Sequence, residues 1–198
     1  MSNLLKRIIT SILLAVVLLF CLFYNKNLWL LLLLLVSIIS FFEFSKLINK
    51  IFKNRNISIA LINLTTLFYL IFFTFSAYDL AEVNVNIFFV ILVCIFSDIG
   101  GYVVGKTVGG KKLTKISPNK TVSGSIGSFV FSFIPLFIFS ILFYEKINSL
   151  FINLIFLSIF ISLISQVGDL FISFFKRKAG VKDTGNILPG HGGILDRI

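Results

Sequence analysis

The stretch LFINLIFLSIFISLISQVGDLFISFF, residues 150–175, decides the fold class. A helix needs about 20 mostly apolar residues to cross a bilayer, and this run is long enough. Backbone polar groups in hydrocarbon must be hydrogen-bonded within their own segment, so the stretch is predicted to be a membrane-spanning helix. The chain has 198 residues, 58% of them hydrophobic, and a mean hydropathy of +1.04. This composition excludes an ordinary soluble domain.

Similar apolar runs fill most of the remaining chain. The six predicted spans are residues 8–24, 28–42, 57–78, 85–104, 125–144 and 150–175. The second of them is short, and a continuation through Phe44 and Leu47 is left open. No linker is long enough to divide them, so we expect one all-α, polytopic membrane domain over residues 1–198. Cys21 and Cys94 both lie inside apolar runs, so no disulfide framework is expected. Glu43, just after the second run, is interpreted as a structural residue that lies at the membrane interface or pairs with Lys46 or Lys50.

The basic residues fall in alternate connecting segments. Before the first predicted span and after the second, fourth and sixth there are two, four, five and five of them, 16 of the 18 Lys and Arg. Lys and Arg are retained on the cytoplasmic side, so both termini are predicted to be cytoplasmic in a multi-pass protein of the cell (inner) membrane. The net charge of +10 is attributed to this topology, and no nucleic acid is expected as a partner.

A polar stripe runs along the last predicted span. Its members, spaced three or four residues apart, are Ser158, Ser162, Ser165, Asp169 and Ser173. This spacing places them on one helix face. Hydrogen bonds between helices would explain the serines alone, but an ionisable group inside a span is a functional candidate by default. We therefore favour a stripe that lines a hydrated cavity.

A charged and glycine-rich segment follows this span. It contains Lys176, Arg177, Lys178, Lys182, Asp183, Pro189, Gly190, His191, Gly192, Gly193, Asp196 and Arg197. Carboxylates suit hard cations, and glycines let backbone N–H groups approach an anion. We expect a metal and phosphate site at the membrane surface.

These residues carry a resemblance to a known family. The pattern Ser173-x-x-Lys176-Arg177-x4-Lys182-Asp183-x-Gly185-x3-Pro189-Gly190-His191-Gly192-Gly193-x-x-Asp196-Arg197 resembles the signature of the phosphatidate cytidylyltransferase (CDP-diacylglycerol synthase) family. A second block, Ser97-Asp98-x-Gly100 through Gly105-Lys106, Ser117-Pro118-x-Lys120-Thr121 and Gly124, is similar to another family motif. Relatives continue beyond the position of Ile198 with a further aspartate and usually an apolar segment, so the C-terminal end is expected to be truncated relative to the family.

The resemblance implies an activity and a site. The reaction would transfer the cytidylyl group of CTP to phosphatidate, with Mg²⁺ held by Asp169 and Asp196. The implied catalytic residues are Asp169, Lys176, Arg177, Lys182, Asp183, His191, Asp196 and Arg197. The implied substrate-binding residues are Asp98, Ser117, Lys120, Ser173, Gly190, Gly192 and Gly193. Asp183 would bind metal or orient Lys182, and His191 would donate a proton or contact a phosphate.

Two local features qualify the resemblance. Relatives usually continue the Lys120-Thr121 block with Trp-Glu-Gly, where this chain has Val122-Ser123-Gly124, so an acidic residue is missing. Residues 100–107 satisfy the P-loop pattern, but a P-loop needs a buried strand before its glycines, and here a predicted span precedes them. The P-loop interpretation is rejected.

Two other function classes remain open at this stage. A CTP-dependent polyprenol or phytol kinase would use the γ-phosphate of the nucleotide, which the glycine-rich ending disfavours. A small transporter would use Asp98 and the polar stripe as its pathway, but it needs polar residues through the full depth of several spans. The oligomeric state is left open, a homodimer included.

Overall fold

The computed structural model describes residues 3–53, 55–142, 151–188 and 192–197. These residues form helices joined by loops, with two isolated β-bridges within the loops. They fall into two compact units, Met1–Asn84 with Phe175–Ile198, and Val85–Phe174. Each unit is described by itself below. The prediction of one functional domain over the whole chain stays a prediction.

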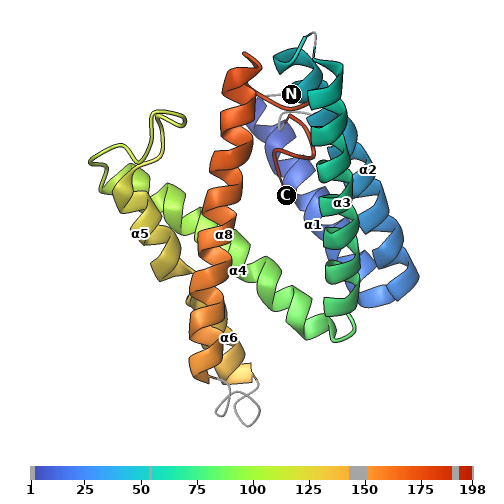
Figure 1. Cartoon of the computed structure of the whole chain (residues 1–198). Coiled ribbons are helices and arrows are strands. Elements are labelled where there is room, and N and C mark those ends of the chain that lie inside the picture. Colours follow the sequence, from blue (N-terminus) through green and yellow to red (C-terminus); the bar gives the residue numbers. More distant parts are fainter. Residues whose placement is uncertain (1–2, 54, 143–150, 189–191, 198) are drawn as a thin grey trace. The chain divides into compact units, whose positions relative to one another are not determined.

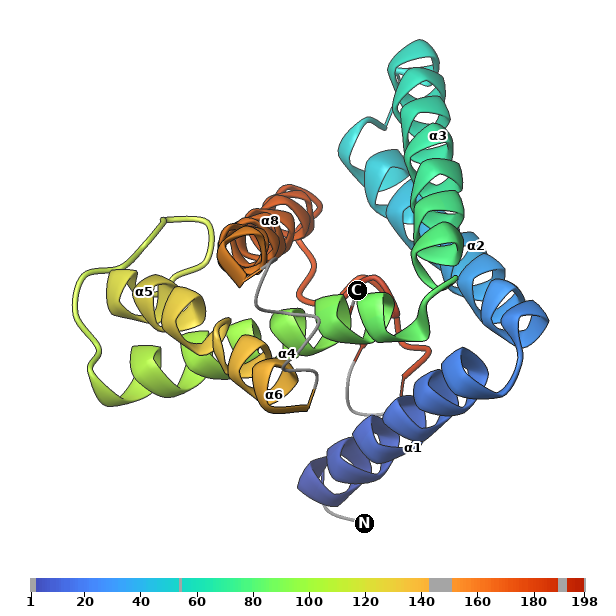
Figure 2. The ribbon, with the colours of Figure 1, turned by 90° about the horizontal axis from the view of Figure 1, so that it is seen from below.

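The first unit contains α1 (Asn3–Tyr24), α2 (Lys26–Ile51) and α3 (Asn56–Leu80). Helix α2 lies beside both α1 and α3 (Figures 1 and 2). It begins at the N-cap Asn25, whose side chain accepts a hydrogen bond from the amide of Asn27 at 2.7 Å. Two hydrogen bonds join α2 to α3: Trp29 Nε1 donates to the carbonyl of Ala77 at 3.2 Å, and the hydroxyls of Ser37 and Thr74 lie 2.8 Å apart. Such bonds supplement apolar packing where the surroundings are hydrocarbon.

The second unit contains α4 (Asn84–Thr107), α5 (Val122–Phe131), α6 (Ile134–Leu142) and most of α8 (Phe151–Lys178). Its buried core consists of Phe89 and Val93 of α4 with Leu136 and Phe139 of α6. Helices α5 and α6 are separated by a turn at Ser132 and Phe133. Pro135 causes this break, because it has no backbone N–H and its ring would clash with the carbonyl four residues earlier.

Helices α4 and α5 cross at close range. A Cβ atom added to Gly100 would overlap the carbonyl oxygen of Gly127, and one added to Gly127 would overlap Val104. Gly101 also faces α5, where Ser128 is its nearest neighbour. Small residues let two membrane helices approach closely, and these glycines leave the room that the crossing of α4 and α5 needs.

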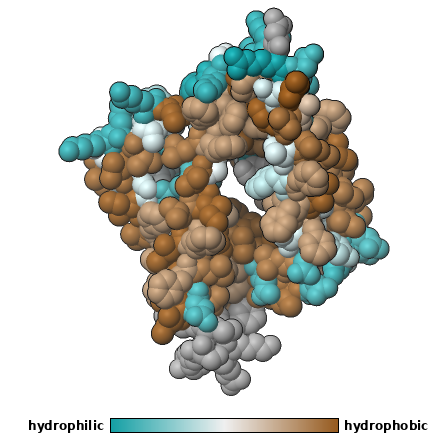
Figure 3. All heavy atoms as spheres, in the orientation of Figure 1, coloured by the Kyte–Doolittle hydropathy of each residue, from teal (hydrophilic) through white to brown (hydrophobic). Residues whose placement is uncertain are grey.

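The predicted spans correspond to helices. Five are long and apolar enough to cross a membrane: Lys26–Ile51, Asn56–Leu80, Asn84–Thr107, Val122–Leu142 and Ile152–Lys178. The first predicted span is the shorter apolar segment Ile8–Tyr24 of α1. Figure 3 shows apolar residues over the sides of the helices and polar residues gathered at helix ends and loops. The chain is a multi-pass, all-helical membrane protein.

Candidate active site

The polar segment after α8, described for residues 181–188 and 192–197, forms a loop, called here the C-terminal loop. Helix α8 is closed by Gly180, whose φ of 64° lies in the left-handed region that ends many helices. Leu188 and Gly192 then exchange two backbone hydrogen bonds of 2.9 and 3.1 Å, which draw the two sides of the loop together. Pro189, Gly190 and His191 lie outside the described residues.

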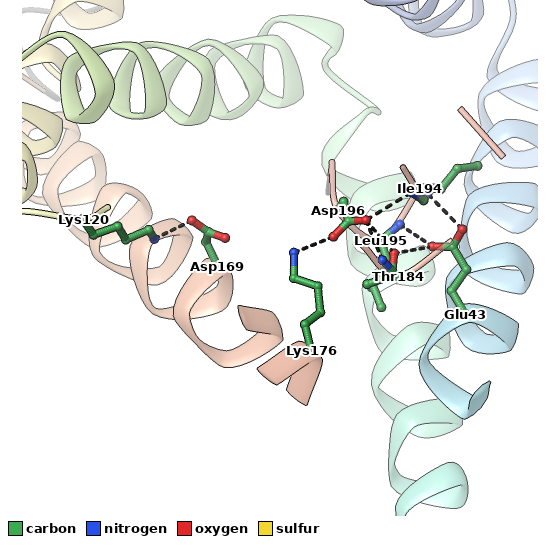
Figure 4. A network of polar contacts seen from close by, with 9 residues as sticks. Glu43, Lys120, Asp169, Lys176, Thr184, Ile194, Leu195 and Asp196 are labelled. Carbon is green, nitrogen blue, oxygen red and sulfur yellow. Dashed lines mark hydrogen bonds and ion pairs between the residues drawn. The ribbon is translucent and has the colours of Figure 1, made fainter. Parts of the chain in front are cut away.

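Asp196 holds the C-terminal loop from within. Its Oδ1 accepts a hydrogen bond from Lys176 Nζ at 2.6 Å, and the side chains of this ion pair are only 17% and 5% exposed (Figure 4). Its Oδ2 accepts bonds from the amide of Thr184 at 2.8 Å, the hydroxyl of Thr184 at 2.9 Å and the amide of Gly193 at 3.1 Å. Burial raises the pKa of Asp196, but the bonds from Lys176, Thr184 and Gly193 outweigh it and leave the pKa below its usual value.

Glu43 of α2 accepts hydrogen bonds from the same loop. It is 3% exposed, and its two oxygens accept hydrogen bonds from the amides of Ile194 at 3.1 Å and Leu195 at 2.9 Å. Its Oε2 also lies 3.0 Å from the hydroxyl of Thr184 (Figure 4). The prediction that Glu43 is structural holds, but its partners are these loop residues rather than Lys46 or Lys50.

A second polar contact lies in the other unit. Lys120 Nζ forms an ion pair with Asp169 Oδ2, and the two side chains are 27% and 58% exposed (Figure 4). Lys120 reaches this position from the loop between α4 and α5, which is folded back on itself. Leu113 donates to the carbonyl of Lys120 at 2.8 Å, and Val122 donates to that of Lys111 at 2.9 Å. The predicted phosphate-binding lysine is therefore held in a short hairpin beside α8.

The hairpin leads directly into α5. Thr121 is the N-cap of this helix, and its Oγ1 accepts a hydrogen bond from the amide of Gly124 at 3.0 Å. Ser123 takes the position at which the resemblance predicts an acidic residue, and its hydroxyl donates to the carbonyl of Gly109. Ser123 thus ties the two ends of the loop together. The first turn of α5 contains no acidic side chain.

The polar stripe on α8 has two kinds of members. Ser158 and Ser162 are fully buried, with Ser158 bonded to the carbonyl of Leu154 and Ser162 bonded to Ser97 of α4 at 2.8 Å. The prediction of a hydrated cavity is wrong for these two serines, because close packing against neighbouring side chains excludes water. Asp169, farther along α8, is exposed. Ser165 and Ser173, on either side of Asp169, are half-buried, so the described stripe becomes accessible from Ser165 onward.

The remaining predicted residues are distributed between the two units. Asp183 lies next to Gly192 in the C-terminal loop, and Arg177, Lys182 and Arg197 are exposed. In the second unit, Asp98 is exposed on α4, Ser117 lies in the hairpin and Ser173 is half-buried on α8. Residues 100–107 are part of α4, which confirms that they form no P-loop. The assignment of these residues to a reaction stays a prediction.

The carboxylates fit a magnesium ion in part. Among the described residues no three His, Cys, Asp or Glu side chains gather into a metal-binding group. Mg²⁺ needs only one or two protein carboxylates when substrate phosphates and water complete its shell. Asp169 has an exposed carboxylate, whereas Asp196 has three donors on Oδ2 and one on Oδ1. Asp196 could therefore bind a metal only through a free lone pair of Oδ1.

The sequence analysis did not connect Glu43 and Thr184 with each other or with Asp196. Glu43 lies 141 residues before Thr184, so no local pattern connects the two. One signal was present, because Glu43 is a carboxylate in a helix that is otherwise mostly apolar. The same argument that singled out Asp98 and Asp169 applies to it.

Comparison with known proteins agrees with the resemblance noted above. Residues 55–198 match the model of the family described as "Cytidylyltransferase family". The chain is 45% identical over 113 residues to the phosphatidate cytidylyltransferase of Bacillus subtilis (strain 168), which covers 57% of this chain and 41% of the relative. It is 41% identical over 115 residues to that of Helicobacter pylori (strain ATCC 700392 / 26695), which covers 58% and 42%. The corresponding protein of Rickettsia bellii (strain RML369-C) is 46% identical over 110 residues, or 51% and 46%.

The chain thus spans less than half the length of these curated relatives. The family model, in contrast, matches well over half of the chain and includes both motif blocks. The chain belongs to the Cytidylyltransferase family.

Proposed function

We propose that this protein transfers the cytidylyl group of CTP to phosphatidate, which makes it a nucleotidyltransferase of phospholipid synthesis. The observation that carries the proposal is the family match over residues 55–198, a range that contains both lysine–carboxylate pairs. A substrate with three phosphates and a lipid phosphate calls for fixed cations at the end of a membrane helix. Lys120 and Lys176 are ordered by their carboxylate partners and supply such cations.

The chemistry is a displacement at phosphorus. An oxygen of the phosphatidate phosphate attacks the α-phosphorus of CTP and forms a new P–O bond. The bond from the α-phosphorus to its bridge oxygen breaks, and pyrophosphate leaves with the electron pair. The protein forms no covalent bond, so its residues act by orientation and by neutralising charge. Lys120 and Lys176 would bind non-bridging oxygens, and Arg177 and Lys182 would extend this basic surface.

The residues proposed to bind Mg²⁺ are Asp169 in one unit and Asp196, through its Oδ1, in the other. When bound, Mg²⁺ would neutralise charge on the triphosphate and on the leaving pyrophosphate. Lys176 forms an ion pair with Asp196, and Lys120 forms one with Asp169. Each lysine could leave its carboxylate and bind a phosphate oxygen, while the carboxylate binds Mg²⁺ in its place. The lysine then still faces a negative charge and the carboxylate still faces a positive one.

The site is proposed to face the cytoplasm, where CTP is found. The support is the distribution of basic residues, 16 of 18 on one side of the predicted spans. Lys120, Lys176, Arg177 and Lys182 all belong to this majority. The homodimer stays a prediction.

The experiment is a pyrophosphate-release assay with purified full-length protein, CTP and Mg²⁺ in lipid vesicles. Pyrophosphate should appear only when the vesicles contain phosphatidate. Diacylglycerol, which lacks the attacking phosphate, is the matched control and should give none. Release that is equal with diacylglycerol, or absent with phosphatidate, would contradict the proposal.

A further inference from the structure

We infer that Glu43 is a positioning residue that anchors the C-terminal loop to α2 and thereby keeps Asp196 and Lys176 in place for a polyphosphate. The role in catalysis rests on the proposed function, whereas the anchoring does not. The inference begins with the contrast between the environment of Glu43 and its chemistry. A carboxylate that is 3% exposed on a membrane helix is costly unless polar groups surround it.

The loop itself supplies the polar groups. Ile194 and Leu195 are consecutive residues, and their amides donate to different oxygens of Glu43, at 3.1 and 2.9 Å. They lie at the start of a final turn in which the amide of Arg197 donates to the carbonyl of Ile194 at 2.8 Å. The first amides of a turn have no partner within it, so an external carboxylate satisfies them as a capping residue would.

Two glycines make room for this contact. A Cβ atom on Gly193 would overlap Glu43 Oε2 and Thr184 Oγ1, and one on Gly185 would overlap Glu43 Oε1. Glycines in such a loop were expected to let backbone approach a phosphate. In the described loop, Gly185 and Gly193 instead leave room for the carboxylate of Glu43, while the amide of Gly193 donates to Asp196.

Thr184 links Glu43 to Asp196. Its hydroxyl lies 3.0 Å from Glu43 Oε2 and 2.9 Å from Asp196 Oδ2, and its amide donates to that same Asp196 oxygen at 2.8 Å. A hydroxyl has one hydrogen, so it donates to one carboxylate at a time. The chain of contacts runs from Glu43 through Thr184 to Asp196 and ends at Lys176, 2.6 Å from Asp196 (Figure 4). Removing the Glu43 carboxylate should therefore change the position of Lys176, although the two side chains are linked only through Thr184 and Asp196.

An aromatic contact beside Glu43 also joins α2 to the end of α8. Phe44, next to Glu43, is 6% exposed and packs edge-to-face on Phe175 of α8, with ring centroids 5.1 Å apart. The last turn of α8 is thus held to α2 by an apolar contact, and the loop that follows it is held by a polar one. Both contacts come from one turn of α2.

The test compares Glu43→Gln with two other substitutions in the full-length protein. Gln keeps the size of the side chain, but its NH₂ group must face one of the two donating amides. Thr184→Val keeps the shape and removes the hydroxyl. Ser40→Ala is the matched control, because Ser40 is also buried on α2 and its hydroxyl donates to the carbonyl of Val36 in its own helix.

The first readout is independent of activity. Trypsin should cut after Lys182, which is exposed, about tenfold faster in Glu43→Gln and Thr184→Val than in wild type, because cleavage needs local opening of the loop. Ser40→Ala should be cut at the wild-type rate. Equal rates in Glu43→Gln and Ser40→Ala would overturn the anchoring.

The second readout is kinetic. Glu43→Gln should lower kcat for transfer about a hundredfold at saturating CTP, a loss typical of misplaced catalytic groups. Thr184→Ser should retain activity, and the double variant Glu43→Gln/Thr184→Val should be no slower than Glu43→Gln alone, because both act through one chain of contacts. If the losses of kcat in the two single variants multiply in the double variant, Glu43 and Thr184 do not act through one chain of contacts. A wild-type protein without transferase activity would refute the proposed function, and the trypsin result would still decide the anchoring.

Discussion

Replacing Asp196 with Asn should release Lys176 from the C-terminal loop. If the Asn carbonyl takes the place of Oδ2, it keeps the three bonds from Thr184 and Gly193. The Asn NH₂ group then faces Lys176 Nζ, and two donors meet where an ion pair stood at 2.6 Å. The opposite rotamer restores Lys176 but loses the other three bonds. Neither orientation satisfies all the donors.

The size of the effect follows from this mismatch. Breaking one side of a buried ion pair costs about 3–5 kcal/mol, and the low end applies here because Lys176 is still 17% exposed. About 3 kcal/mol corresponds to a factor of roughly 100 in the population of the ordered loop, since 1.36 kcal/mol is tenfold. Turnover should fall at least a hundredfold, and by several powers of ten if Asp196 also binds the metal.

The assay is turnover as a function of Mg²⁺ concentration, with membrane insertion checked by expression level. Insertion should survive, because the substitution removes a charge. A loss of turnover that added Mg²⁺ does not change indicates only the structural role. A loss that added Mg²⁺ partly restores indicates a ligand as well. Near-normal turnover with an unchanged Mg²⁺ requirement would refute the reasoning.

Three further predictions concern Asp169, pH and topology. Asp169→Asn should lower turnover by several powers of ten, while Lys112→Ala, in the same hairpin as Lys120, should change it little; near-normal turnover in the first variant would remove Asp169 as a ligand. The pKa of Asp196 is lower in the folded protein than in the unfolded chain. Its contribution to the free energy of unfolding is therefore fully present above the unfolded pKa of about 3.9 and is lost as the pH falls through the folded pKa. The difference in Tm between wild type and Asp196→Asn should therefore be constant from about pH 8 to 5 and shrink only below about pH 4, and a difference that fades near pH 6 would contradict this assignment. Cysteines at Asn54 and Asn186 should react only with reagents that reach the cytoplasm, whereas one at Asn148 should react from outside, and outside labelling at Asn186 in intact cells would reverse the topology.

The sequence predicted the helices well because membrane spans depend on local composition. Apolar runs of sufficient length predict helices whatever they pack against, so five of the predicted spans match segments long and apolar enough to cross a membrane, one of them broken into α5 and α6. The second run was predicted over residues 28–42 with a continuation through Phe44 and Leu47 left open, and α2 does continue, as far as Ile51. The polar residues after Phe42 made the end of this helix hard to predict from hydropathy. A helix can include a polar residue such as Glu43 when a loop satisfies its hydrogen bonds.

The contacts of the site depended on tertiary structure and were harder to predict. Motif spacing singled out Lys120, Asp169, Lys176 and Asp196, and each proves to be in an ion pair with another member of that set. The spacing could not show which lysine meets which carboxylate. It also treated the polar stripe as uniform, although Ser162 is buried against Ser97 and Asp169 is exposed. Helical periodicity gives the face of a residue but not what covers that face.

The most direct test of the proposed function follows the position of the label in CTP. Full-length protein is incubated with phosphatidate vesicles, Mg²⁺ and CTP labelled at either the α- or the γ-phosphate, and the lipid is then extracted. Transfer of the cytidylyl group predicts label in the lipid from α-labelled CTP and none from γ-labelled CTP, because the γ-phosphate leaves as part of pyrophosphate. Label in the lipid from the γ position would contradict the account and indicate a lipid kinase.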